Sequence, residues 1–233
     1  MIKAVLFDLD GTLLPMDQDL FIKAYFGALV RALAPRGYDE TLPKAIWKGT
    51  EAMIKNDGGV TNEDKWWTTF CGIYGEGARQ EEKFLEHFYA TDFNEVSKAC
   101  GYSKEAREVI DLCKERGFRV ILATNPVFPR IATSARARWA GLELEDFEHV
   151  TSYENSHFAK PNLDYYREIL ERTGLDASEC VMVGNDVTED MVTERLGMKT
   201  FLLTDCLINK NGEDISRFPR GSFAELKEFI NSL

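Results

Sequence analysis

The fold is decided by one stretch near the amino terminus, Ile2-Lys3-Ala4-Val5-Leu6-Phe7-Asp8-Leu9-Asp10-Gly11-Thr12. Its first six residues are apolar apart from one lysine, which predicts a short buried strand that ends in a polar turn. Three later segments repeat this design, because residues 118–123, 180–183 and 199–203 each run into a polar cluster. A weaker strand is expected over 149–152.

Helical patterns separate these strands. A final helix is expected over 222–230, where Ser222-Phe223-Ala224-Glu225 fits a capping box. Strands that alternate with helices predict right-handed βαβ units around a parallel sheet. The expected fold class is therefore α/β, a Rossmann-like core of three layers with ligands beyond the carboxyl ends of the strands. The other helices are expected over 103–116, 129–140, 162–173 and 187–196.

Residues 15–101 interrupt this alternation with consecutive amphipathic helices and no convincing strand between them. They predict an inserted all-helical cap domain, and the α/β core is expected to comprise residues 1–14 and 102–233. Trp47, Trp66 and Trp67 could line a pocket for an aromatic or sugar leaving group, but aromatic residues at helical spacing are expected to form the core of the cap, and no substrate role is assigned to them. The lysines of the cap, among them Lys44, Lys48 and Lys55, are expected to be solvated.

Composition limits the possible partners. Of 233 residues, 44% are apolar, enough for a sizeable core, and 39 acidic residues against 28 basic ones give a formal charge of −11. This acidic balance argues against nucleic acid or an anionic membrane as partner. Five cysteines without a Cys-x-x-Cys pair, and no secretory or membrane segment, suggest reduced thiols and a cytoplasmic monomer or small homo-oligomer.

Two carboxylates stand where the first strand ends. Asp8 and Asp10 are two residues apart, and residues i and i+2 of a strand point to the same side, so both can face one crevice. One carboxylate of such a pair suits a nucleophile, and the other suits a proton donor whose pKa is raised by its neighbour's charge. In isolation, the alternative is a pair of solvated turn aspartates.

Polar side chains also follow the later strands. Thr124 and Asn125 come directly after residues 118–123, where a hydroxyl and backbone N–H groups suit phosphate oxygens, although ordinary turn chemistry is the alternative. Lys160 stands before Pro161, ahead of an expected helix. A lone lysine is usually a solvated charge, but among carboxylates it would neutralise both an aspartate nucleophile and an incoming phosphate.

The last cluster is Gly184-Asn185-Asp186-Val187-Thr188-Glu189-Asp190. Asp186 and Asp190 are four residues apart, which places them one turn apart on the same face of the expected helix. Hard carboxylate oxygens suit Mg²⁺, which takes one or two protein carboxylates and completes its coordination with water and phosphate. Capping of the helix is the alternative role for these aspartates.

In chain order, the motifs Asp-x-Asp-Gly-Thr, strand-Thr, Lys-Pro and Gly-x-Asp-x-x-x-Asp resemble those of the haloacid dehalogenase superfamily. The resemblance covers residues 1–14 and 102–233, and the helical insertion resembles the C1-type cap of its phosphatases, such as the phosphoglycolate phosphatases. It implies a Mg²⁺-dependent phosphomonoester hydrolase that acts on a small phosphorylated metabolite through an aspartyl phosphate. The dehalogenases of the superfamily lack an aspartate at the position of Asp10, so dehalogenation is disfavoured. Expelling an alkoxide needs a proton donor, whereas expelling a halide does not.

The resemblance also implies roles for the motif residues. Asp8 would accept the phosphoryl group, Asp10 would act as general acid and then general base, and Lys160 would steady Asp8 and the phosphate. Thr124 and Asn125 would bind phosphate oxygens. The alternatives are a sugar phosphomutase, which shares this chemistry, and a catalytically idle domain that retains the fold for binding or regulation.

The metal ligands implied by the resemblance are Asp8, the backbone carbonyl of Asp10 and Asp186. Asp190 would support the metal or its waters. Many members place the aspartate directly after the glycine, whereas Asn185 intervenes here. A different turn would exchange the roles of Asp186 and Asp190.

Overall fold

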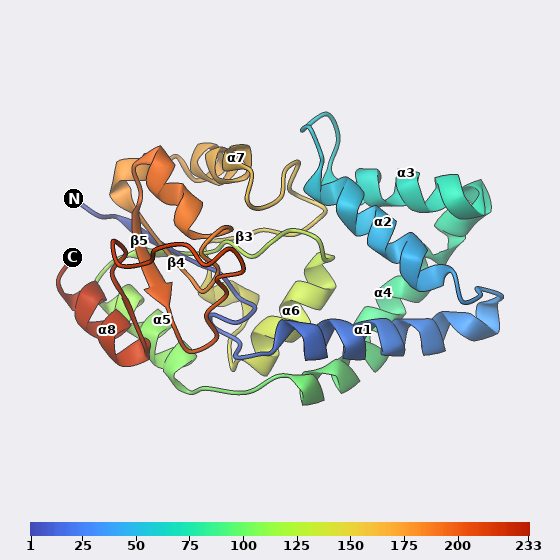
Figure 1. Ribbon diagram of the computed structural model, residues 1–233, viewed down its shortest axis with the longest axis horizontal. Coiled ribbons are helices and arrows are strands. Elements are labelled where there is room, and N and C mark those ends of the chain that lie inside the picture. Colours follow the sequence, from blue (N-terminus) through green and yellow to red (C-terminus); the bar gives the residue numbers. More distant parts are fainter.

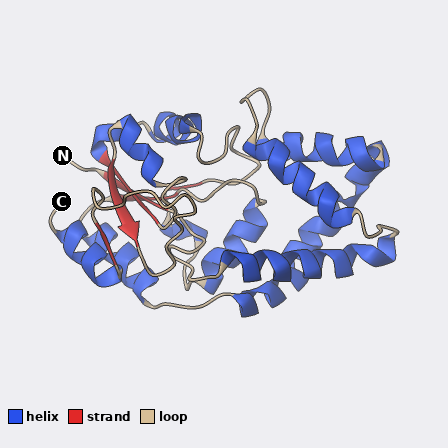
Figure 2. Ribbon diagram, in the orientation of Figure 1, coloured by secondary structure: helices blue, strands red, loops and turns tan.

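The computed structural model describes residues 1–233 and contains a six-stranded sheet in which every neighbouring pair of strands is parallel (Figures 1 and 2). The spatial order is β3-β2-β1-β4-β5-β6, so the direction of strand addition reverses beside β1. The expected α/β fold class is confirmed. The strands are β1 Ala4–Phe7, β2 Arg119–Leu122, β3 His149–Val150, β4 Cys180–Gly184, β5 Lys199–Leu203 and the unexpected short β6 Arg220–Gly221.

Helices cover both faces of the sheet. Alternate residues of β1 point to opposite sides, and both sides are buried, as a strand inside a three-layer core requires. Val5 and Phe7 join the apolar cluster under α5 Glu105–Glu115, α6 Arg130–Trp139 and α8 Phe223–Asn231. Ala4 and Leu6 join the cluster under α7 Leu163–Thr173 and the 3-10 helix η6 Met191–Leu196.

The segment between Pro15 and Gly101 contains helices and no strand. Its two ends lie side by side, because Met16 and Cys100 form an antiparallel bridge and the Gly101 N–H donates to the Pro15 carbonyl at 2.7 Å. The bounds of a cap over 15–101 and of a core over 1–14 and 102–233 stay a prediction. The segment's main helices are α1 Gln18–Leu33, α2 Leu42–Ile54, α3 Asn62–Tyr74, α4 Glu82–Ala90 and the 3-10 helix η3 Asp92–Ala99.

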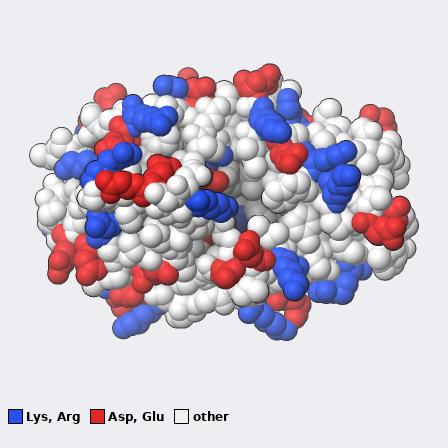
Figure 3. All heavy atoms as spheres, viewed as in Figure 1, with Lys and Arg blue, Asp and Glu red and all other residues white.

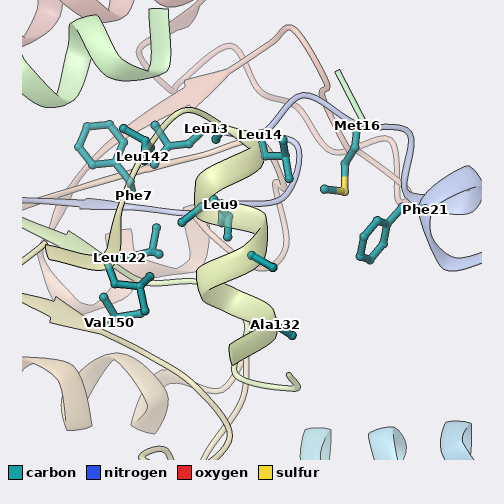
Figure 4. Close-up of a cluster of buried hydrophobic side chains, with 14 of the residues drawn as sticks. Phe7, Leu9, Leu13, Leu14, Met16, Phe21, Leu122, Ala132, Leu142 and Val150 are labelled. Atoms are coloured by element: carbon teal, nitrogen blue, oxygen red, sulfur yellow. The ribbon is translucent and has the colours of Figure 1, made fainter. Parts of the chain in front are cut away.

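One apolar cluster runs from the sheet into this helical segment. Figure 4 shows side chains from neighbouring strands, Phe7, Leu122 and Val150, packed on the side of the sheet where α6 lies, and the cluster continues to Met16 and Phe21. Burial of such side chains is the dominant favourable term in folding. Figure 1 shows the consequence for shape, an α/β lobe beside a helical lobe with α6 between them. No helix is long and apolar enough to cross a membrane.

The expected helix over 187–196 is wrong in its first half. Residues 187–190 form turns, and only Met191–Leu196 is helical, as a 3-10 helix. The cause is local: the Asp186 carboxylate accepts hydrogen bonds from the backbone N–H groups of Thr188 and Glu189, at 2.8 and 2.9 Å. An aspartate that bonds its own following backbone competes with a regular helix.

Candidate active site

The ends of three neighbouring strands bring the predicted residues together. Asp8 follows β1, Thr124 follows β2 and Asn185 follows β4, and β1 lies between the other two strands. Ligands of parallel α/β sheets bind at such a reversal of strand order. A cavity of about 470 Å³ opens there, and Figure 3 shows the surface hollowed between the two lobes. On the sheet side the cavity is lined by Asp8, Asp10, Asn125, Asn185, Asp186, Glu189 and Asp190.

Lys160 lies behind this wall and holds two carboxylates. Its ammonium, only 1% exposed, donates to Asp8 Oδ1 at 2.8 Å and to Asp190 Oδ1 at 2.6 Å. Burial by itself lowers the pKa of Lys160, but the carboxylates of Asp190 and Asp8 outweigh it and raise that pKa well above the usual value. The lysine is therefore a fixed positive charge beside Asp8.

A hydroxyl network leaves the other oxygen of Asp8 weakly bonded. Thr12 Oγ1 lies 2.9 Å from Asn185 Oδ1 and 3.2 Å from Asp8 Oδ2. A hydroxyl has one proton, so the shorter contact to Asn185 takes it. Gly11 makes this approach possible, because its φ is +84° and a Cβ there would lie 2.4 Å from the Asn185 amide. Asp8 Oδ2 is thus the oxygen that remains for chemistry.

Asp10 lies at the cavity with one oxygen bound and one free. Arg136, whose side chain is 0% exposed, donates to Asp10 Oδ2, and its guanidinium also lies 4.4 Å from the centre of the Phe128 ring. Asp10 Oδ1 is buried and has no hydrogen-bond partner. Burial raises the pKa of the Asp10 carboxyl, and Arg136 opposes this effect. The pair orients Asp10 and leaves Oδ1 available to a ligand.

The loop after β2 presents a second unpartnered group. Thr124 Oγ1 is buried without a hydrogen-bond partner, while the Thr124 carbonyl accepts from Tyr165 Oη at 2.8 Å, which anchors the backbone. Asn125 Nδ2 donates to Glu189 Oε2 at 3.1 Å. Burial raises the pKa of Glu189 to about 8. Buried polar atoms are nearly always paired, so the orphaned hydroxyl indicates a place for a polar ligand.

Asp186 and Asp190 do not present their carboxylates as a pair on one helix face. Asp190 is buried, bonds Lys160 through Oδ1 and accepts from the Asp186 N–H through Oδ2 at 3.0 Å. Gly184 allows this position, since a Cβ there would lie 2.1 Å from the Asp190 carboxylate. Asp186 lines the cavity and also caps its own turn. Both residues line the cavity, but the carboxylate of Asp190 is already engaged by Lys160 and by the Asp186 N–H.

The donors around the cavity are of one chemical kind. Asp8, Asp10 and Asp186 line it, no histidine or cysteine does, and no group of three or more His, Cys, Asp or Glu side chains is already gathered as a metal centre. A site with two carboxylates, a carbonyl and room for water matches Mg²⁺, whereas Zn²⁺ is bound mainly by nitrogen and sulfur. The residues present therefore fit the implied ion.

The helical segment supplies the opposite wall of the cavity. Trp67 is buried in the apolar cluster and Trp66 packs against it, as expected, and both also line the cavity together with Trp47. Trp66 does pack, lying 4.8 Å from the Phe70 ring and nearly parallel to it, which explains the helical stripe. One face of an aromatic ring can pack while another borders a cavity. None of Lys44, Lys48 and Lys55 lines the cavity.

Sequence reasoning missed Arg136 and Glu189. Arg136 follows Ala132 by four residues, so the helical period placed it on the buried face of α6, and an arginine in such a stripe is the signal that could have found it. Glu189 lay inside the last motif but was assigned no role. The other predicted residues line the cavity, except Lys160, which lies behind Asp8, and Thr124, which is buried next to the lining residue Asn125.

The chain matches the family model of haloacid dehalogenase-like hydrolases over residues 2–193. A glyceraldehyde 3-phosphate phosphatase from Methanothermobacter thermautotrophicus is 27% identical over 241 residues, which cover 99% of this chain and 100% of that protein. A phosphoglycolate phosphatase from Vibrio parahaemolyticus is also 27% identical and covers 98% of this chain and 96% of its own length.

Solved structures support the same fold. A 2-haloacid dehalogenase from Pseudomonas syringae superposes with a TM-score of 0.65 at 19% identity, covering 100% of this chain and 99% of that one. The prediction of a family phosphatase is confirmed by the relatives named above. By its family model and its fold, the chain belongs to the haloacid dehalogenase-like hydrolases.

Proposed function

We propose that this protein hydrolyses the phosphate monoester of a small metabolite, with Asp8 as the nucleophile and Mg²⁺ as the cofactor. The observation that carries the proposal is the environment of Asp8. Its carboxylate borders the cavity, a buried ammonium holds one of its oxygens, and the second carboxylate of the motif, Asp10, lines the same cavity. An oriented carboxylate beside a fixed cation is what attack on a phosphate requires.

The reaction has two steps. Asp8 Oδ2 attacks phosphorus in line and forms an acyl phosphate, while the Asp10 carboxyl gives its proton to the departing alkoxide. Water then attacks the same phosphorus, and Asp10 takes back a proton as Asp8 is released. The unpartnered Oδ1 of Asp10 supports this role, because Arg136 occupies only the other oxygen.

The non-bridging oxygens of the phosphate require donors. Thr124 Oγ1, which lacks a partner, and the Asn125 amide supply them from the loop after β2, and Lys160 supplies positive charge from behind Asp8. When bound, Mg²⁺ neutralises developing charge on these oxygens. Asp8, the carbonyl of Asp10 and Asp186 would hold it. We also propose that the helical segment 15–101 acts as a cap over the site, and a cytoplasmic monomer or small homo-oligomer stays a prediction.

The proposal is tested by phosphate release from a panel of sugar, nucleoside and aryl phosphates, with wild-type protein and Asp8→Asn. The wild type is expected to release free phosphate with Mg²⁺ and to stop after chelation with EDTA. The variant keeps the shape of Asp8 but loses the nucleophile, so at most about 10⁻³ of the activity is expected to remain. Equal hydrolysis by the variant would overturn the assignment, and an isomerised sugar phosphate without free phosphate would identify a mutase.

A further inference from the structure

The wall of the cavity that faces Asp8 indicates a class of substrate. We infer that the leaving group is bulky, largely aromatic or apolar, and free of any second negative charge. This inference rests on the proposed function and deepens it. Several relatives are named for substrates with a second negative charge, because phosphoglycolate carries a carboxylate and pyrophosphate a second phosphate. The inferred substrate of this protein differs from these.

The surface that faces Asp8 across the cavity is rich in aromatic side chains. The cavity extends from Asp8 across to α1, α2, α3 and α4, and aromatic side chains from all four helices line it, among them Tyr25, Trp47, Trp66 and Tyr89. Phe128 and Tyr153 add rings from the α/β lobe. Apolar and aromatic walls are typical of sites that bury a large part of an organic ligand. A two-carbon acid would leave most of this surface without a contact.

The side chains that line the cavity include no positive charge. None of the residues that line the cavity is lysine, arginine or histidine, whereas four glutamates, Glu63, Glu82, Glu86 and Glu154, lie on the wall away from Asp8. The two buried cations of the site are already engaged, Lys160 by Asp8 and Asp190 and Arg136 by Asp10. A second anion would be desolvated here without a cation to pair it. Figure 3 shows acidic and basic side chains together on the outer surface beside the hollow. The excess of negative charge is therefore a property of the residues that line the cavity.

The glutamates on the wall away from Asp8 differ in whether a positive group pairs with them. Glu82 pairs with Arg79 at 2.9 Å, and Glu154 accepts from the Arg130 N–H at the start of α6. Glu86 also lacks an ion-pair partner but is exposed to solvent, whereas Glu63 is half-buried in the first turn of α3 and has no ion-pair partner. Burial together with the charge of Glu154 raises the pKa of Glu63. An amine on the leaving group would supply the missing positive charge. Trp67 Nε1, buried at the same cavity, also lacks an acceptor.

The experiment compares three phenyl phosphates that differ only at the para position, with methyl, aminomethyl or carboxylate, and adds phosphoglycolate. For wild-type protein with Mg²⁺, kcat/KM is expected to be at least about tenfold lower for the carboxylate than for the methyl compound, because like charges brought together in a partly desolvated site repel each other. The aminomethyl compound is expected to equal or exceed the methyl compound. Phosphoglycolate is expected to be the poorest of the four.

Substitutions of Glu63 test whether its negative charge disfavours an anionic leaving group. Glu63→Lys is expected to raise the carboxylate-to-methyl ratio of kcat/KM by about tenfold or more. Glu40→Lys makes the same change of charge at an exposed position of the helical segment outside the cavity, and is expected to leave the ratio unchanged. If Glu63→Lys fails to fold, Glu63→Gln is expected to remove any advantage of the aminomethyl compound. An unchanged ratio in folded Glu63→Lys would overturn the role of Glu63.

Failure of this inference differs from failure of the proposed function. If phosphoglycolate or the carboxylate compound is hydrolysed best, and the activity disappears in Asp8→Asn, the phosphatase stands and the inferred substrate class is wrong. If wild-type protein releases phosphate from sugar or nucleoside phosphates but from none of these four compounds, the inferred substrate class is wrong and the phosphatase stands. If it releases phosphate from no compound of either set, both are wrong.

Discussion

Lys160 is the residue on which the geometry of the site depends most directly. Its ammonium lies between the carboxylates of Asp8 and Asp190, away from water. A buried cation in this position has given up its hydration, and the two carboxylates replace it. Removing the lysine leaves two carboxyl groups buried beside each other without the cation that pairs them.

Lys160→Met tests this arrangement. The free energy of unfolding is expected to fall by about 3–5 kcal/mol, because one partner of a buried ionic cluster is lost. Phosphate release is expected to fall by about 10²–10³-fold, since the phosphate loses a fixed positive charge. Urea titration and steady-state assays measure the two effects.

The double variant Lys160→Met/Asp190→Asn is the control. Removing one of the two stranded charges is expected to recover part of the stability but none of the activity. A single variant as stable as the wild type would contradict the proposed role of the cluster.

Some of the site residues were predictable one at a time, and others were not. Asp8 and Thr124 follow apolar strands, so the topology of a parallel sheet brings them together once the strands are recognised. Arg136 was not predicted, because helical periodicity shows which face is buried but not that a guanidinium on that face reaches Asp10 from another segment. Such a contact depends on how α6 packs.

At the scale of elements, the end of β4 and the turn after it position Asp190. Gly184→Ala is expected to destabilise the protein by about 1–3 kcal/mol and to lower activity, because the new methyl would lie where the Asp190 carboxylate lies. Thermal unfolding and phosphate release measure both effects.

Gly72→Ala is the matched control for Gly184→Ala. Gly72 lies in α3 with no atom within 4 Å of an added Cβ, and alanine is expected to stabilise the helix by about 0.5–1 kcal/mol. If Gly184→Ala behaved like Gly72→Ala, the close approach of Asp190 to β4 would be wrong.

A second element-scale prediction concerns the link between α5 and the segment before β3. Asp146 accepts from Arg107 Nη1 at 2.8 Å and from Lys114 Nζ at 2.7 Å, and the hydrogen bonds from Arg107 contribute most to lowering its pKa. A lowered folded-state pKa stabilises the fold above the ordinary pKa of an aspartate, and the benefit is lost as pH falls below it.

Asp146→Asn is therefore expected to be less stable than wild type by about 1 kcal/mol at pH 7, a modest value because Arg107 and Lys114 are partly exposed. The difference is expected to shrink as pH falls from 4 toward 2. Urea titrations across this range measure it. A difference that stays constant or grows at low pH would contradict the ion pairs.

The elements themselves were largely predictable, with one instructive exception. The four main strands appear within two residues of their expected bounds, because a buried parallel strand is a nearly continuous apolar run. The helix expected over 187–196 begins only at Met191, because Asp186 bonds the following backbone and Asp190 turns back to Lys160. The sequence does not reveal which of two local hydrogen-bond patterns an aspartate takes.

At the scale of the whole molecule, the site needs both lobes. The sheet brings the motif residues to one edge, and the helical segment closes the cavity with Trp47, Trp66 and Trp67. The sequence motifs alone predicted the side of the cavity that the sheet forms. The side formed by the helical segment depends on how helices far apart in the chain pack against the α/β lobe. Periodicity does not specify this packing, so the sequence left open whether the tryptophans border a pocket.

The central claim is that Asp8 becomes phosphorylated during the reaction, and a trapping measurement tests it most directly. Wild-type protein is mixed with a good substrate and Mg²⁺, quenched in acid within one turnover, digested and analysed by mass spectrometry. The expected result is a phosphoryl group on the peptide that contains Asp8, at a level that rises and falls with turnover. Free phosphate formed without phosphorylation of that peptide at any time would contradict the account.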